Sequence, residues 1–194
     1  MTMEQIDFTD HSAVQARLLA LHSSNSDTNT SGNDSKKRKV LLWMETPSNP
    51  QGKVTDIAAV TTMARALFPH PDELAVVVDS TWATPYLLNP LQLGADYVMH
   101  SVTKYIGGHS DVLGGIVTAS TDAVQRADVR AITVREMQQG VGRSSGGTPN
   151  LPDLLTNLRT IHQVGGGVCG PLESWLASRG LRTLPVRLNH QCER

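Results

Sequence analysis

Short, continuous apolar runs recur along most of the chain, separated by polar or glycine-containing turns. Four of them, Val40–Met44, Leu74–Val78, Tyr97–His100 and Gly115–Ala119, are typical of strands buried on both faces. Between the first two, apolar residues of Val54–Phe68 recur at the spacing of one helix face. Strand, helix and strand in this order favour right-handed crossovers. We therefore predict an α/β fold, with a mostly parallel sheet and flanking helices.

Two segments before the first strand differ in character. Residues 12–21 predict a short helix, in which Ser12 and Gln15 fit a capping box. Residues 23–39, SSNSDTNTSGNDSKKRK, are almost wholly polar and cannot bury apolar surface. We expect them to be a disordered insert between two elements of the fold.

The last third of the chain has glycine-rich interruptions. The region 121–157 is rich in Gly, Ser and Arg and predicts a helix followed by a mobile loop. Helical spacing returns over about 152–164. A further helix is predicted over 171–178, stopped by Gly180.

Composition narrows the classes of partner. The 194 residues carry a net charge of -1, so no basic excess is available for a phosphate backbone, and we expect no nucleic-acid partner. No run approaches the roughly 18 apolar residues of a membrane span, so we expect no membrane partner. Cys169 and Cys192 lack metal-ligand spacing. We predict buried or free thiols, no metal site and a cytoplasmic location.

Candidate chemistry gathers where the predicted parallel strands end. Polar residues follow the first three strands directly, at 46–49, 79–81 and 101–104. Ligands of open parallel sheets bind at the carboxyl ends of the strands. We therefore expect these segments, with a carboxylate, an amine, hydroxyls and an amide, to converge on one rim.

This set suits a cofactor that carries both an aldehyde and a phosphate. The amine of Lys104 can form a Schiff base with an aldehyde. The hydroxyls of Ser101 and Thr103 can grip a phosphate beside it. The carboxylate of Asp79 can keep a pyridine nitrogen protonated, which makes the ring an electron sink.

The residue types alone leave simpler interpretations open. An aspartate at a strand end more often caps a helix or a turn, and a lysine at the start of a loop is usually solvated. A cofactor site is the minority interpretation on this basis. A dinucleotide site has less support, because no Gly-x-Gly-x-x-Gly follows a strand, and the Walker phosphate loop is also absent.

Three longer segments resemble one known family. Residues 45–57 (ETPSNPQGKVTDI), 76–115 and 170–187 are similar to the Cys/Met-metabolism pyridoxal-phosphate enzymes. The middle segment follows the family pattern almost without gaps. The family includes cystathionine γ-synthase, cystathionine γ-lyase and β-lyase, methionine γ-lyase and O-acetylhomoserine sulfhydrylase.

The resemblance implies part of the large domain of a type I aminotransferase-like fold, with pyridoxal 5'-phosphate as its cofactor. It implies that Lys104 is the catalytic Schiff-base lysine and that Asp79 pairs with the pyridine nitrogen. The other implied cofactor-binding residues are Asn49 near the ring oxygen and substrate carboxylate, Thr81 near the ring, and Ser101 and Thr103 at the phosphate.

The function implied is a transsulfuration enzyme. It acts on cystathionine or an activated homoserine by β/γ-elimination or γ-replacement. Its substrate is a small amino acid, and the intact enzyme is expected to be a homotetramer or homodimer. The alternative is an inactive or non-catalytic fragment that associates with full-length subunits.

The resemblance also divides the chain. We expect an N-terminal helical segment at 1–22, the disordered insert at 23–39, the cofactor-binding core at 40–180 and the start of a C-terminal domain at 181–194. Family members continue further at both ends, so we expect this chain to be an incomplete copy of the enzyme.

Overall fold

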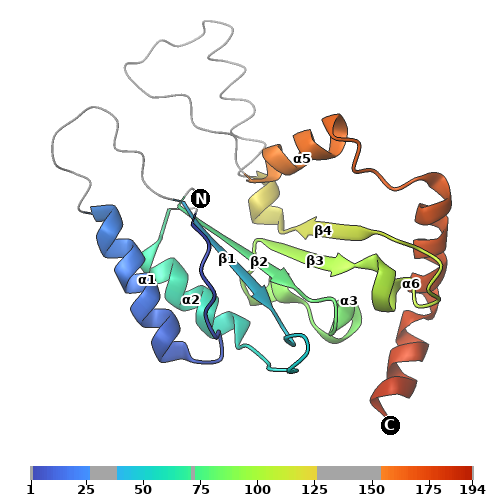
Figure 1. The fold of residues 1–194 in the computed structure, drawn as a ribbon, viewed down its shortest axis with the longest axis horizontal. Coiled ribbons are helices and arrows are strands. Elements are labelled where there is room, and N and C mark those ends of the chain that lie inside the picture. Colours follow the sequence, from blue (N-terminus) through green and yellow to red (C-terminus); the bar gives the residue numbers. More distant parts are fainter. Residues whose placement is uncertain (1, 27–38, 71–72, 126–153, 194) are drawn as a thin grey trace, which may run out of the picture.

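The computed structural model describes residues 2–26, 39–70, 73–125 and 154–193, which form a sheet with helices packed against it (Figure 1). The predicted loop before residue 152 and most of the predicted insert at 23–39 lie outside the described residues. The elements, in chain order, are α1 (His11–Ser26), β1 (Val40–Glu45), α2 (Ile57–Leu67), β2 (Leu74–Asp79), α3 (Thr84–Leu87), η2 (Pro90–Leu93), β3 (Tyr97–Ser101), η3 (Val102–Ile106), β4 (Gly115–Ala119), α5 (Leu154–Val164) and α6 (Pro171–Cys192).

The sheet has the strand order β1-β2-β3-β4. The first three strands are parallel to one another, and β4 pairs antiparallel to β3. Each parallel strand extends one residue beyond the predicted apolar run, to Glu45, Asp79 or Ser101. Glu45 still pairs with Asp79, because backbone pairing does not depend on an apolar side chain. The α/β fold with a mostly parallel sheet is confirmed.

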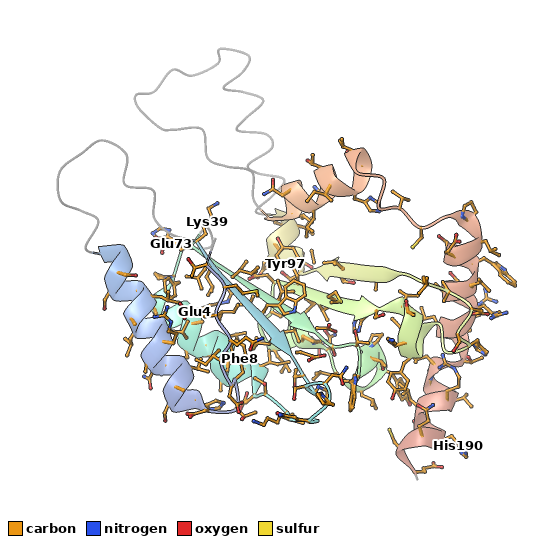
Figure 2. The ribbon with its side chains drawn as sticks, viewed as in Figure 1. Glu4, Phe8, Lys39, Glu73, Tyr97 and His190 are labelled. Atoms are coloured by element: carbon orange, nitrogen blue, oxygen red, sulfur yellow. The ribbon has the colours of Figure 1, made fainter. Side chains whose placement is uncertain are left out.

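One face of the sheet is covered by α1 and α2. Val14 and Leu18 of α1 and Val60 of α2 are buried against it. The first turn before α1 adds Phe8, which Figure 2 shows beside these helices. This face holds the largest cluster of buried apolar residues in the described ranges, and burying one such side chain contributes about 1.5–3 kcal/mol.

Aspartates define where these helices begin. The carboxylate of Asp10 accepts the N–H of Ala13 at 3.0 Å, so Asp10 caps α1 and the predicted capping box at Ser12 is wrong. Asp56 accepts the N–H of Ala59 at 2.9 Å, which starts α2 later than the predicted residue 54. In both cases a short carboxylate satisfies a free amide of the first turn.

The end of α1 differs from prediction, whereas the end of α5 agrees with it. Helix α1 continues to Ser26, so residues 23–26 of the predicted disordered insert are helical. Helix α5 ends at Val164 as predicted. Polar residues extend α1 because a helix end needs only solvated backbone groups, not an apolar face.

The opposite face of the sheet packs against α5. Leu155 and Leu158 of α5 contact Val77, Tyr97 and Ala123. Figure 2 shows Tyr97 on the side of the sheet toward α5. Apolar contacts on both faces explain why the strand sequences are continuous rather than alternating.

Helix α6 corrects another prediction. It runs unbroken through Gly180, where the sequence predicts a stop. A Cβ at Gly180 would overlap the carbonyl oxygens of Ile106 and Gly107. The glycine is therefore placed there by the close approach of α6 to η3, rather than by a helix end.

The free cysteines agree with the sequence, since Cys169 and Cys192 are both exposed thiols. Within the described ranges, no helix is long and apolar enough to cross a bilayer. The same ranges contain no cluster of His, Cys, Asp or Glu side chains arranged to hold a metal ion.

The contact at Gly180 predicts an inverted mutational effect. Gly→Ala inside a helix ordinarily stabilises by about 0.5–1 kcal/mol. Gly180→Ala should instead destabilise the fold by about 1–3 kcal/mol, because the new methyl group overpacks the junction with η3. Urea denaturation measures the change. Arg182→Ala, at an exposed position of the same helix, is the control and should change stability by less than about 0.5 kcal/mol. An increase in stability for Gly180→Ala would contradict the packing described here.

Candidate functional site

The three parallel strands end at one edge of the sheet, next to a large cleft. The cleft has a volume of about 1170 Å³. It is lined by every residue that the sequence marks as a candidate, namely Asn49, Asp79, Thr81, Ser101, Thr103 and Lys104. The amine of Lys104 and the carboxylate of Asp79 therefore belong to the same cleft, as the strand-end rule predicts.

A short hydrogen-bond network fixes the carboxylate of Asp79. The backbone N–H and the hydroxyl of Thr81 both donate to Asp79 Oδ1, at 3.0 and 2.6 Å. Thr81 Oγ1 in turn accepts the N–H of Ser101 at 2.9 Å, which joins the ends of β2 and β3. Among the described residues, Asp79 Oδ2 has no hydrogen-bond partner, so one oxygen remains available to a ligand.

Lys104 lies on a turn that departs from regular geometry. The π-helical segment η3 follows β3 directly and has a non-helical backbone at Lys104 (φ -92°, ψ -119°). Two backbone hydrogen bonds close the turn. The N–H of Gly107 donates to the carbonyl of Val102 at 2.7 Å, and the N–H of Gly108 donates to that of Lys104 at 2.8 Å. The side chain of Lys104 is exposed. Its amine is therefore accessible from the cleft while its backbone is held.

The hydroxyl of Thr103 is partly engaged by the protein. It accepts the N–H of Gly114 at 3.1 Å and makes a long contact of 3.4 Å to the carbonyl of the same residue. Ser101 is half-buried at the end of β3. The bond at 3.4 Å is near the limit of a hydrogen bond, so the Thr103 hydroxyl proton can turn to a stronger acceptor such as a phosphate oxygen.

Asn49 reaches the cleft from the turn after β1. Its N–H donates to Glu45 Oε2 at 3.0 Å. The turn is anchored below by buried Thr46, whose hydroxyl oxygen accepts the N–H of Thr55 at 3.0 Å. The exposed Asn49 amide is thus presented by a fixed backbone.

Sequence reasoning missed the contribution of α6. Arg187, Glu173 and Gln191 of this helix line the cleft. Arg187 donates to the carbonyl of Tyr105, 82 residues away in the chain, at 2.8 Å. No local pattern signals such a contact, and the predicted stop at Gly180 hides it further.

The face of β3 away from the cleft holds His100. Alternation along a strand sends His100 and Ser101 to opposite faces. His100 is 4 % exposed, and its Nδ1 lies 3.1 Å from the carbonyl oxygen of Ser80, to which it donates. Burial lowers the pKa of His100, and the Ser80 carbonyl and the charge of Asp79 oppose that change only in part. His100 is therefore a neutral structural residue at neutral pH.

Sequence comparison connects this geometry to known proteins. Residues 6–194 match the sequence profile of the Cys/Met metabolism PLP-dependent enzymes. A protein of Herpetosiphon aurantiacus named "Probable cystathionine gamma-synthase" is 33% identical over 97% of this chain and 43% of its own length. An L-methionine gamma-lyase of Treponema denticola is 36% identical over 81% of this chain and 31% of its own length.

Structural comparison gives the same result. The crystal structure of cystathionine gamma-lyase from Lactobacillus plantarum, complexed with L-serine, matches with a TM-score of 0.63 and 30% identity. The match covers 96% of this chain and 35% of the lyase chain. The chain thus spans less than half the length of the relatives described here.

The matched family is described as PLP-dependent, and the cleft offers groups that fit pyridoxal phosphate. An exposed amine, Lys104, is available to its aldehyde. The oxygen Oδ2 of Asp79, unpaired within the described residues, is available to its ring nitrogen. The hydroxyls of Ser101 and Thr103 neighbour the lysine in the same cleft and are available to its phosphate.

The neutral state of His100 predicts a pH dependence of stability. Its folded-state pKa lies below the ordinary value of 6.5, so the unfolded chain binds more protons as the pH falls. The contribution of neutral His100 to the free energy of unfolding is fully present above pH 6.5 and is lost as the pH falls below that value. His100→Gln should lack this loss between pH 7 and 5 when unfolding is measured in urea at each pH.

A second group acts in a separate range. A hydrogen bond from Lys53, followed by bonds from Thr9, lowers the pKa of Asp7. Stability from Asp7 is present above its unfolded pKa of 3.8 and is lost only as the pH falls below that value.

Equal pH dependence of the wild type and His100→Gln between pH 7 and 5 would contradict the assignment to His100.

Proposed function

Because the chain belongs to the Cys/Met metabolism family of PLP-dependent enzymes, we propose that its cleft binds pyridoxal phosphate through Lys104 and serves a transsulfuration reaction. The intact enzyme acts on cystathionine or an activated homoserine, by β/γ-elimination or γ-replacement. The observation that carries this proposal is the shared position of Lys104 and Asp79 on one cleft at the strand ends.

Lys104 has two roles in the proposal. Its Nζ would hold the cofactor at its aldehyde carbon, and the same amine would act as the general base for the proton on the α-carbon of the substrate. When bound, the cofactor supplies a ring that takes up the electron density left at that carbon. The irregular turn of η3 holds the lysine backbone while the exposed side chain moves between these roles.

The other candidate residues hold and orient the cofactor and the substrate. The carboxylate of Asp79, fixed by Thr81, keeps a proton on the ring nitrogen. The hydroxyls of Ser101 and Thr103 bind the phosphate. The amide of Asn49, on its anchored turn, contacts the ring oxygen or the substrate carboxylate.

The domain organisation and location are part of the same proposal. We place the cofactor-binding core at residues 40–180 and the start of a C-terminal domain at residues 181–194. The exposed free thiols of Cys169 and Cys192 suit a reducing compartment, so we place the protein in the cytoplasm.

Covalent capture of the cofactor tests the site directly. The chain is incubated with pyridoxal phosphate, reduced with borohydride and digested, and the adduct is located by mass. The adduct should lie on Lys104 and be absent from Lys104→Ala. The matched control Lys53→Ala removes an exposed, ion-paired lysine that is not among the residues lining the cleft, and it should retain the adduct. An undiminished adduct in Lys104→Ala would overturn the proposal.

Asp79→Asn separates binding from chemistry in the same assay. It should keep the Lys104 adduct, because the amine is unchanged. It should slow α-proton exchange of the amino-acid substrate by about a hundredfold or more, because an amide does not stabilise the protonated ring.

A second candidate function is association with other subunits, as a non-catalytic chain. It is favoured by apolar side chains that remain exposed. Leu41 and Trp43 are half exposed on β1, an edge strand among the described residues, and Val117 is 49% exposed on β4. An edge strand with exposed apolar residues is a site of association.

This surface predicts self-association of the isolated chain. Sedimentation should show a mass that rises with concentration in the micromolar range. Replacing Leu41 and Trp43 together by Thr, which retains strand propensity, should reduce the association. Replacing the exposed Leu19 of α1 by Gln is the control and should leave it unchanged. A wild-type chain that stays monomeric at every concentration would exclude self-association through this surface.

A further inference from the structure

The turn that carries Lys104 leaves two carbonyl groups for a partner outside the turn. The carbonyls of Val102 and Lys104 accept the N–H groups of Gly107 and Gly108. The next two carbonyls, of Tyr105 and Ile106, receive their hydrogen bonds from a side chain of another element. A short helical segment always has such unpaired carbonyls at its end, and what satisfies them decides how firmly it is held.

That side chain is Arg187 of α6. Its Nη1 donates to Tyr105 O at 2.8 Å, and its Nη2 contacts Ile106 O at 3.4 Å. The same Nη2 donates to Gly180 O at 2.8 Å, and Nε donates to Thr183 Oγ1 at 3.1 Å. The guanidinium is thus oriented by residues of its own helix, and it donates to two carbonyls of the turn that carries Lys104.

Glycines on both sides allow this contact. Gly108 has φ +72°, and a Cβ there would overlap the guanidinium of Arg187. Gly180, on the helix side, faces the carbonyls of Ile106 and Gly107 in the same way. Because both positions are glycines, the backbones of the lysine turn and of α6 approach closely enough for one guanidinium to bridge them.

Apolar packing brings α6 to the turn but does not fix its orientation. Val102, Ile106 and Val112 pack against Leu176 and Ala177 of the helix. Such contacts are not directional, whereas the planar fork of a guanidinium aligns several acceptors at once. Arg187 supplies directional hydrogen bonds from α6 to the turn, in addition to the backbone bonds that close the turn itself.

We propose that Arg187 is a positioning residue for Lys104, acting through the carbonyls of Tyr105 and Ile106. This inference rests on the proposed function of Lys104 as the residue that captures pyridoxal phosphate. The hydrogen bonds of Arg187 do not involve Ser101, Thr103 or Asp79. Loss of Arg187, which itself lines the cleft, should therefore slow covalent capture by a larger factor than it weakens noncovalent binding.

The experiment measures these two quantities separately. Covalent capture is followed as the rate of the Lys104 adduct with pyridoxal phosphate, by absorbance and by mass after borohydride reduction. Noncovalent binding is measured as the Kd of pyridoxine phosphate, which has an alcohol in place of the aldehyde. Arg187→Gln should slow capture by about tenfold or more, because a small displacement of a reacting group has large effects on rate. Because Arg187 lines the cleft, the Kd of pyridoxine phosphate should change too, but by a smaller factor than the rate of capture.

Variants on the same helix provide the controls. Arg182→Gln removes the same charge from an exposed position and should capture the cofactor at the wild-type rate. Arg187→Lys should give a rate between those of the wild type and Arg187→Gln, because one ammonium group does not reproduce the fork. Full recovery by lysine would show that charge alone suffices and would overturn the inference.

A milder variant covers the case in which Arg187→Gln does not fold. Thr183→Val removes only the oxygen that orients Nε, and it should slow capture in the same direction by a smaller factor. Capture at the wild-type rate by folded Arg187→Gln, or by Thr183→Val if the former is unfolded, overturns the positioning role alone. Absence of any Lys104 adduct in the wild-type chain overturns the proposed function, and this inference with it.

Discussion

The parallel alignment of β1, β2 and β3 is the constraint on which the site depends. Parallel strands direct all their carboxyl ends to one edge, so each strand contributes its next residues to the same place. Glu45 and Asp79 are paired in register, and Ser101 is joined to Asp79 through Thr81. Without this alignment, the candidate residues would be distributed over two edges of the sheet. The chemistry of the cleft is therefore a consequence of strand direction.

Alternation along β3 divides the work of that strand between two environments. Ser101 faces the cleft, while neighbouring His100 is buried on the other face and donates to the carbonyl of Ser80. The two residues that follow Asp79 therefore act on different faces of the sheet. The carbonyl of Ser80 accepts the hydrogen bond of His100 on the buried face, and Thr81 donates to Asp79 on the cleft side. Folding and ligand binding use adjacent residues but different sides of the sheet. Substitutions at His100 and at Ser101 should accordingly affect separate properties.

Local patterns in the sequence predicted the strands and the positions of the polar residues that follow them, whereas the roles of those residues rest on the family resemblance. Continuous apolar runs such as Leu74–Val78 have few alternatives to a buried strand, and strand direction then places Asp79 and Lys104 together. Details decided by single hydrogen bonds were harder to predict. Asp10 and Ser12 are both good helix caps, and only the structure shows which of them accepts the amide of Ala13.

Contacts between distant segments were beyond the reach of the sequence pattern. From the sequence alone, Gly180 resembles the end of a helix, because glycine is conformationally flexible and often follows the last helical residue. Its role becomes visible only when the carbonyls of Ile106 and Gly107 are seen to approach it. Arg187 has the appearance of a solvated helix residue for the same reason, although its guanidinium satisfies the lysine turn. A glycine and an arginine separated by two helical turns are thus explained by one surface, the irregular backbone around Lys104. The turn pairs the carbonyls of Val102 and Lys104 itself, and Arg187 of the helix that packs on it donates to those of Tyr105 and Ile106.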